Sequence, residues 1–244
     1  MALLEIRGVS KTFRSLKALD GVDIDVQAGT FHGLIGPNGS GKSTLLKAIA
    51  GAHFADSGTV VFDGRDITRA TPYERARAGL SLKFQITAVL PELSVYDNVL
   101  LAMQSTESLP RLLLSLSRRA LDADVTSLLE RFRLIDRADD LAGELSHGQQ
   151  QWLEIAMALA LRPKLLLLDE PTGGMSPEER RVTGELLAPI KAHCSLIIVE
   201  HDLHFIRDIC DRLTVLDQGK VLDQGDVEAI QRSSKVQQVF TTRV

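Results

Sequence analysis

The chain has 244 residues, of which 44% are hydrophobic, 25% charged and 5% aromatic, which is enough to bury a core and excludes general disorder. The 28 Lys and Arg residues against 32 Asp and Glu residues leave a formal charge of −4, so no basic field favours nucleic acid. The longest nearly apolar stretch, residues 157–168, is interrupted by an Arg-Pro-Lys sequence, and residues 1–9 lack the apolar core of a signal peptide. We therefore expect neither a membrane span nor a secretion signal.

The first part of the chain predicts strands around a glycine-rich turn. An apolar strand leads into the turn at residues 36–41, and residues 42–50 have helical composition that stops at Gly51. Elsewhere, hydrophobic residues alternate with Asp in the period of a half-buried strand. The strands expected here are residues 3–7, 22–26, 31–35 and 58–63.

A helical segment follows. From about Pro72 to Leu161 the sequence is rich in Leu, Ala, Arg and Glu, with breaks at Pro91 and Pro110. This composition indicates a separate helical lobe.

The last third predicts a parallel sheet. Two unalternated apolar runs, 165–168 and 196–199, suit strands that are covered on both faces. Residues 178–191 between them are long enough for a crossover helix, which makes a βαβ unit. The chain then predicts a hairpin of residues 213–216 and 220–222, and a short helix at 226–231.

Residues 36–43 match the phosphate-loop pattern GxxxxGK[ST] and lie between a predicted strand and a predicted helix, as this motif requires. Glycines let successive backbone N–H groups turn toward a polyphosphate, and the following helix start adds its positive end. Lys42 can reach the outer phosphates, and Ser43 can offer a hydroxyl to Mg²⁺. An ordinary glycine-rich turn is the alternative, but all four fixed positions and both flanking elements agree. The predicted nucleotide-binding residues are Gly36, Pro37, Asn38, Gly39, Ser40, Gly41, Lys42, Ser43 and Thr44.

Two carboxylates end the first apolar run. Asp169 and Glu170 follow four leucines at the C-terminal end of a strand, where open α/β sheets place their ligands. Adjacent strand residues point to opposite sides, so we expect the two to have different tasks. Asp169 suits magnesium coordination, and Glu170 would polarise the water that attacks the γ-phosphate. A strand that simply exits to solvent is the alternative.

With these motifs in place, the sequence resembles the ATP-binding subunit of an ABC transporter over nearly its whole length. The further motifs that carry the resemblance are Lys83-Phe84-Gln85 for the glutamine loop, Leu145 to Gln149 for the LSGGQ signature, residues 171–177 for the D-loop region, and Glu200-His201-Asp202 for the histidine switch. Together and in the family's order, these motifs are far more specific than any one of them.

The resemblance implies the fold. It predicts a single ABC ATP-binding domain over residues 1–244, of the α/β class: a P-loop NTPase core with a mainly parallel sheet, an N-terminal antiparallel β subdomain and an inserted helical subdomain. We place the core at about 1–84 and 162–244, and the helical subdomain at about 85–161.

The signature predicts a site shared between chains. Ser146 and Gly148 precede a helix and form a second anion-binding helix start, although an ordinary Ser-capped helix would look alike. One chain cannot easily bring both helix starts to one phosphate. The resemblance implies two chains head to tail, with ATP between the phosphate loop of one and Ser146, Gly148 and Gln149 of the other.

Three single residues complete the predicted site. His201 follows the strand 196–199 and could hydrogen-bond the γ-phosphate, whereas a lone histidine would more often be structural. Gln85 could contact metal or water, and without the other motifs it would read as a surface glutamine. Phe13 lies where the family stacks an aromatic ring on adenine, and core packing is its alternative. The predicted catalytic residues are then Lys42, Gln85, Glu170 and His201, and the predicted metal ligands are Ser43, Gln85 and Asp169.

Two residues depart from the family pattern: His147 replaces a signature glycine, and Ser176 stands where many members have the D-loop aspartate. The sequences LSHGQ, Gly174-Met175-Ser176 and Leu82 to Gln85 are similar to the branch that imports urea and short amides, close kin of the branched-chain amino-acid importers. The predicted function is an ATPase, with ATP and Mg²⁺ as cofactors, that drives such an importer by closing and opening a dimer.

The resemblance also implies partners. We expect a homodimer or a heterodimer with a second ABC ATPase, transmembrane permease subunits, an indirect link to a periplasmic or extracellular solute-binding protein, and no nucleic acid. Residues 86–99 would form the groove for the permease, so the chain would lie at the cytoplasmic face of the membrane as a peripheral subunit. The alternatives are branched-chain amino-acid import, an ABC ATPase not linked to transport, and a regulatory module that binds ATP without hydrolysing it.

Overall fold

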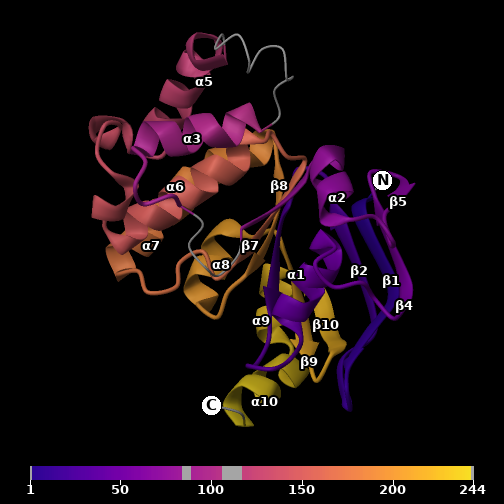
Figure 1. The fold of residues 1–244 in the computed structure, drawn as a ribbon. Helices are drawn as coiled ribbons and strands as arrows, with labels where there is room; N and C mark the ends of the chain where they lie inside the picture. The colour runs from indigo at the N-terminus through magenta and orange to yellow at the C-terminus, as the bar shows by residue number, and fades with distance from the viewer. Residues whose placement is uncertain (1, 84–88, 106–116, 243–244) are drawn as a thin grey trace.

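The computed structural model describes residues 2–83, 89–105 and 117–242, which form two β-sheets with surrounding helices (Figure 1). The first sheet is antiparallel, in the order β2-β1-β4-β5. Val22, Ile24 and Val26 are buried on one face while the residues between them are exposed, so the predicted alternation is confirmed. The strands of this sheet are β1 (Ala2–Phe13), β2 (Leu16–Gln27), β4 (Ser57–Phe62) and β5 (Arg65–Asp66).

The second sheet has six strands in the order β10-β9-β3-β8-β7-β6. All its neighbouring pairs are parallel except β9 and β10, which form the predicted hairpin. Every residue of β7 and β8 is buried, as the unalternated apolar runs predict. The strands are β3 (Phe31–Ile35), β6 (Leu80–Lys83), β7 (Leu165–Asp169), β8 (Ser195–Val199), β9 (Arg212–Asp217) and β10 (Lys220–Asp226).

Helices cover both faces of the six-stranded sheet. The α-helices are α1 (Lys42–Ala50), α2 (Pro72–Ala78), α3 (Val95–Gln104), α5 (Ser117–Arg131), α6 (His147–Ala160), α7 (Pro177–Leu187), α8 (Leu203–Ile209), α9 (Val227–Arg232) and α10 (Ser234–Thr242). Short 3₁₀ helices are η1 (Ile135–Arg137), η2 (Ala142–Glu144) and η3 (Ala188–Ala192). The α-helix expected to reach residue 191 ends at Leu187 and continues as η3, because Pro189 has no N–H for a helical hydrogen bond.

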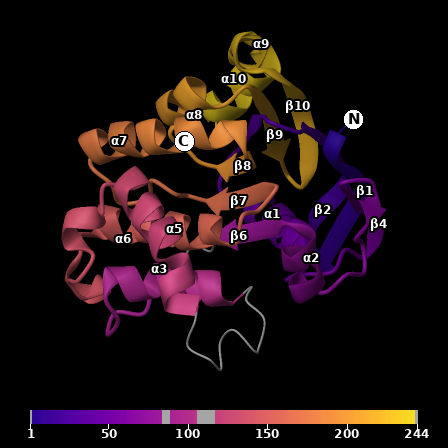
Figure 2. The same ribbon diagram turned by 90° about the horizontal axis from the view of Figure 1, so that it is seen from above.

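The core lies on both sides of the parallel sheet. Leu166 and Leu168 of β7 belong to the cluster that contains α3, α6, α7 and α8, and Leu165 and Leu167 belong to the cluster that contains the first sheet and α1. Seen from above, α7 and α8 lie on one side of β7 and β8, and α1 with the antiparallel sheet lies on the other (Figure 2). The α/β architecture with its antiparallel and mainly parallel sheets is thus confirmed.

The helical segment begins later than the composition predicts. Residues 80–83 form β6, a strand that pairs with β7 at the edge of the parallel sheet. The sequence Leu80-Ser81-Leu82-Lys83 is too short to display a period, so its strand depends on the neighbouring β7. The expected helical character from Pro72 is therefore wrong for these residues. The boundaries placed at 85 and 161 stay a prediction.

A buried arginine fixes the far end of α1. Arg75 is 1% exposed, and its Nη1 donates to the carbonyl oxygens of Ala48 and Ile49, both at 2.7 Å. Its Nε and Nη2 donate to the carbonyls of Ala70 and Thr68 at 2.9 and 3.1 Å. Arg75 therefore binds last-turn carbonyls of the helix that follows the phosphate loop, where a cation is favourable.

Replacing Arg75 by lysine tests this role. A lysine keeps the charge, but its single ammonium group cannot match the planar set of donors that reaches four carbonyls. We expect the free energy of unfolding to fall by about 2–4 kcal/mol, measured by urea unfolding. Arg77→Lys is the matched control on the same helix, because Arg77 is exposed and lies over the Tyr73 ring. An equal loss in both variants would contradict the assignment.

Candidate functional site

The phosphate loop lies between the end of β3 and the start of α1. Gly36, Gly39 and Gly41 have φ values of +150°, +76° and +108°, a backbone that L side chains rarely adopt. A Cβ on Gly36 would lie 2.1 Å from the carbonyl oxygen of Leu216. Gly41 caps α1 without a side-chain hydrogen bond. The loop thus presents backbone N–H groups and a helix N-terminus to a ligand.

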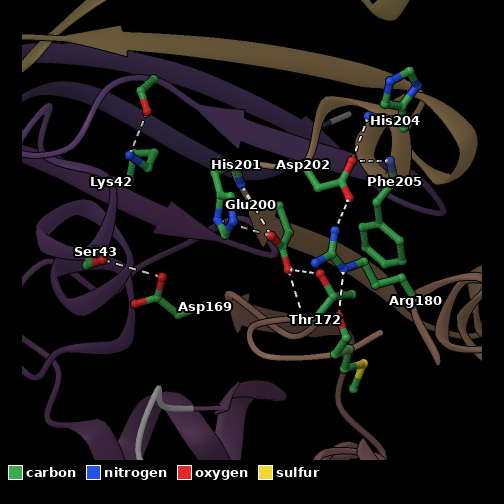
Figure 3. A network of polar contacts seen from close by, with 12 residues as sticks. Lys42, Ser43, Asp169, Thr172, Arg180, Glu200, His201, Asp202, His204 and Phe205 are labelled. Carbon is green, nitrogen blue, oxygen red and sulfur yellow. Dashed lines mark hydrogen bonds and ion pairs between the residues drawn. The ribbon is translucent and has the colours of Figure 1, made fainter. Parts of the chain in front are cut away.

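The side chains of Lys42 and Ser40 in this loop indicate that it binds a polyanion. Lys42 folds back over the loop, with Nζ donating to the carbonyl oxygens of Gly36 at 2.8 Å and Pro37 at 2.9 Å (Figure 3). Burial lowers the pKa of Lys42, and the nearby carboxylates of Glu170 and Asp169 oppose that shift. The buried hydroxyl of Ser40 has no hydrogen-bond partner within the described part of the chain. Buried hydroxyls are normally hydrogen-bonded, so the oxygens of a ligand would suit this position.

The predicted metal ligands Ser43 and Asp169 meet across two elements. Oγ of Ser43, on α1, lies 3.3 Å from Oδ1 of Asp169 at the end of β7 (Figure 3). Burial raises the pKa of Asp169, the Ser43 hydrogen bond opposes this, and the neighbouring Glu170 raises it again. The third predicted metal ligand, Gln85, lies outside the described residues. Among the described residues, the Ser43 hydroxyl and the Asp169 carboxylate thus lie close together at the end of the phosphate loop, and both are oxygen donors of the kind that Mg²⁺ prefers.

Glu170 lies just past the strand. Strand β7 ends at Asp169, and Glu170 has a left-handed φ of +50°, so the expectation that both carboxylates belong to one extended strand is wrong. The Glu170 N–H donates to the carbonyl of Val199 at 2.9 Å, which attaches this turn to β8. Because Ser43 contacts Asp169, and Lys42 and Glu170 are their direct neighbours in the chain, the structure brings the predicted Lys42, Asp169 and Glu170 together.

His201 follows β8, which pairs with β7 as the parallel sheet predicts. Its side chain is 68% exposed, and Nδ1 lies 3.7 Å from Oε2 of Glu200 (Figure 3). Phe13 is 38% exposed, with its ring against the edge of His53 and under the ammonium group of Lys11. Phe13 is therefore a surface ring rather than a core residue, as the stacking hypothesis requires.

The signature residues form a capped helix start. Ser146 accepts the N–H of Gln149, whose side chain accepts the N–H of Ser146 in return. His147 instead contacts the loop after Glu170, with Nε2 at 3.0 Å from the carbonyl of Gly173. The hydrogen bonds of these residues within the described chain thus run to segments other than the phosphate loop.

The sequence analysis assigned no role to four residues that connect the segments of the site. Glu200 is buried and accepts hydrogen bonds from Thr172, and Arg180 of α7 pairs with Asp202 at 2.8 Å (Figure 3). The only signal in the sequence is the acidic residue between a buried strand and His201. A carboxylate there looks solvent-exposed until the neighbouring loop is placed.

Comparison with known proteins fits this geometry. The family model described as ABC transporter matches residues 19–173. A probable branched-chain amino acid transport ATP-binding protein of Archaeoglobus fulgidus is 36% identical over 98% of this chain and 95% of its own length. A ribose import ATP-binding protein of Rubrobacter xylanophilus is 35% identical over 93% of this chain, which spans 45% of that protein.

A solved structure has the same fold. An ATP-binding cassette of an ABC transporter in its ADP conformation superposes with a TM-score of 0.86 and 32% identity, covering 99% of both chains. Among the helices of the described residues, none has the length and apolar composition needed to cross a membrane. The protein is an ABC-type ATPase. It belongs to the ABC transporter family, as the ATP-binding subunit of an importer.

Gly36→Ala tests the shape of the phosphate loop. Its Cβ would lie 2.1 Å from the Leu216 carbonyl and 2.8 Å from Oγ of Ser40, so the loop must move. We expect ATP affinity, measured by fluorescence titration, to fall at least about tenfold. Gly64→Ala is the control, because Gly64 also has a left-handed φ but its Cβ would have nothing within 4 Å. It is expected to cost about 1–2 kcal/mol of stability and to leave ATP affinity unchanged. Equal ATP affinity in both variants would contradict this account.

Proposed function

We propose that the chain powers the import of urea or short amides by hydrolysing ATP between two subunits. The observation that carries the proposal is the convergence of Lys42, Ser43 and Asp169 at one edge of the parallel sheet, with Glu170 directly after Asp169 in the chain. A helix start, an amine, a hydroxyl and two carboxylates at one place suit a magnesium triphosphate and a water molecule.

The residues fit ATP and Mg²⁺. Three features favour a phosphate ligand in the loop: the Ser40 hydroxyl, which has no partner among the described residues, the loop carbonyls that Lys42 contacts, and the space that a Cβ on Gly36 would fill. Residues 36–44 would hold ATP, with Phe13 under the adenine. Ser43 and Asp169 would hold Mg²⁺, with Gln85 as a third ligand. The ion would supply positive charge that stabilises negative charge on the phosphate oxygens.

Each side chain then has one task. Glu170, as general base, would accept the proton of the attacking water. Lys42 would bind the outer phosphates with its ammonium group, and His201 would donate a hydrogen bond to the γ-phosphate and respond to its loss. Gln85 would join the metal side of the site to the helical lobe. This division needs no covalent intermediate on the protein.

A second subunit would complete the site. Ser146, Gly148 and Gln149 form a capped helix start whose hydrogen bonds do not reach this chain's own phosphate loop. They would therefore bind the nucleotide of a partner, either a second copy or a related ABC ATPase. Because ATP contacts both subunits and ADP loses the γ-phosphate between them, hydrolysis would open the dimer.

The other partners follow from the importer family. In the described part of the predicted groove, Leu90 is 42% exposed, and the nearby Leu141 is also 42% exposed. These apolar side chains support docking of a permease helix at the cytoplasmic face of the membrane, with the subunit peripheral and a solute-binding protein linked indirectly. An ABC ATPase not linked to transport is less favoured, since the relatives are import or transport proteins.

The choice of urea or short amides rests on the sequences LSHGQ and Gly174-Met175-Ser176. Branched-chain amino acids are the alternative solute, because the Archaeoglobus relative is named as a branched-chain amino acid transport protein. In the structure, the His147 ring lies beside Gly174, where a Cβ would approach Nε2 to 3.1 Å. The two distinctive sequences therefore pack against each other in the fold.

Glu170→Gln tests the catalytic assignment. The amide keeps the size of the side chain but cannot accept a proton, so we expect hydrolysis to fall about 10²–10⁴-fold while ATP binding remains. Light scattering should then show a stable ATP-dependent dimer of the purified variant. Glu228→Gln is the control, because Glu228 is exposed on α9 and pairs with Arg232. A parental rate would remove Glu170 from its role. A variant that stays monomeric, and also binds no related ATPase, would contradict the shared site.

The solute is tested in the assembled transporter. The chain is purified from membranes with its bound permease and solute-binding protein, and the complex is reconstituted in vesicles. We expect urea or acetamide to bind the solute-binding protein and to stimulate ATP hydrolysis, and leucine to do neither. Stimulation by leucine alone would favour the branched-chain alternative, and co-purification of nucleic acid without a permease would refute the importer.

A further inference from the structure

Glu200 carries a buried carboxylate beside the site. Its side chain has 0% exposure, although it lies between the end of β8 and the exposed His201. Burying a carboxylate is costly unless protein donors replace the lost water. Those donors come from the loop after Glu170 and from His201 itself.

One oxygen of Glu200 holds the loop that follows Glu170. Oε1 accepts the backbone N–H of Thr172 at 2.8 Å and its hydroxyl at 2.6 Å (Figure 3). Thr172 lies two residues after Glu170, whose left-handed φ of +50° costs free energy and persists only where the surroundings hold it. The Glu170 N–H is held by Val199, the residue just before Glu200. The backbone on both sides of Glu170 is thereby attached to the end of β8.

The other oxygen of Glu200 faces the histidine. Oε2 accepts the backbone N–H of His201 at 3.2 Å and lies 3.7 Å from its Nδ1. At 3.7 Å this is an electrostatic contact rather than a hydrogen bond, and the carboxylate favours a ring orientation that keeps Nδ1 toward Glu200. The opposite ring nitrogen, Nε2, is then the one presented to a phosphate.

The two contacts together need a carboxylate. A glutamine could accept both Thr172 hydrogen bonds through its carbonyl oxygen, but its NH₂ group would then meet the His201 N–H, donor against donor. Turning the amide around would place the NH₂ group against the two Thr172 donors instead. Only a group that accepts at both ends satisfies Thr172 and His201 at once.

We propose that Glu200 is a positioning residue for ATP hydrolysis, which fixes the Glu170 backbone and the His201 imidazole relative to each other through Thr172. The proposal rests on the roles proposed above for Glu170 and His201. It assigns Glu200 no contact with nucleotide or metal. Other contacts also join the two loops, among them Arg180 with Asp202 at 2.8 Å, so a change at Glu200 is expected to leave the fold intact.

The experiment compares the full-length chain with Glu200→Gln, Thr172→Val and Thr172→Ser in the presence of ATP and Mg²⁺. We measure kcat, KM, ATP affinity, the melting temperature without nucleotide, and the ¹⁵N shifts of the His201 ring. For Glu200→Gln we expect kcat to fall about 10- to 100-fold, with altered ring shifts. KM and ATP affinity should change less than about threefold. Thr172→Val should lower kcat by a smaller factor, and Thr172→Ser, which restores the hydroxyl, should recover it.

Thr214→Val is the matched control. It removes another buried hydroxyl, which lies 2.8 Å from Nε2 of His32 and away from both loops. This variant should melt at a lower temperature and keep the parental kcat.

Two results would overturn the proposal: a parental kcat in Glu200→Gln, or a kcat that falls only in step with melting temperature and ATP affinity. Glu170→Gln separates this inference from the proposed function. A parental rate in Glu170→Gln refutes the proposed function itself. Slow hydrolysis in Glu170→Gln beside fast hydrolysis in Glu200→Gln refutes only the role of Glu200.

Discussion

The site depends on the parallel pairing of β3, β8 and β7. Because these strands are buried on both faces, they pack in the middle of the molecule, and their C-terminal ends meet at one edge. The phosphate loop leaves β3, the two carboxylates leave β7, and Glu200 with His201 leaves β8. A change of register in any pair would separate these groups, so the apolar strands determine the chemistry as well as the core.

The same arrangement lowers the stability of the folded chain when no ligand is bound. Burial raises the pKa of Asp169 and lowers the pKa of Lys42, so the ionised form of each is disfavoured in the folded chain without ligand. The left-handed backbone at Glu170 adds to this cost, as does the Ser40 hydroxyl, for which the described part of the chain supplies no hydrogen-bond partner. Bound nucleotide would lower much of this free-energy cost. In the ligand-free chain, the apolar clusters on both sides of the sheet offset it.

Communication between the parts of the site has a visible physical basis. The loop after Glu170 is held on one side by Glu200 and on the other by His147, at the start of the helix that carries the signature. A movement of α6 would therefore reach the neighbourhood of Glu170 through Gly173. His147, which departs from the family pattern, has a defined contact here and does not merely fill space.

From the sequence alone, the phosphate loop and the buried strands of the parallel sheet could be predicted, because GxxxxGK[ST] specifies a local backbone and unalternated apolar runs suit strands covered on both faces. The ABC fold as a whole was implied by the resemblance of the motifs to that family. Asp169 was predicted because it follows four leucines, and His201 because it comes soon after an apolar run and belongs to the histidine-switch motif. What depends on distant neighbours became visible only in the folded chain: β6 forms because β7 lies beside it, and Glu170 turns out of the strand with a left-handed φ while its N–H stays bonded to Val199. The burial of Glu200 and its hydrogen bonds with Thr172 could not be predicted from the sequence, because they also depend on a distant neighbour. Its partner Thr172 is far away along the chain and becomes a neighbour only when two parallel strands end side by side.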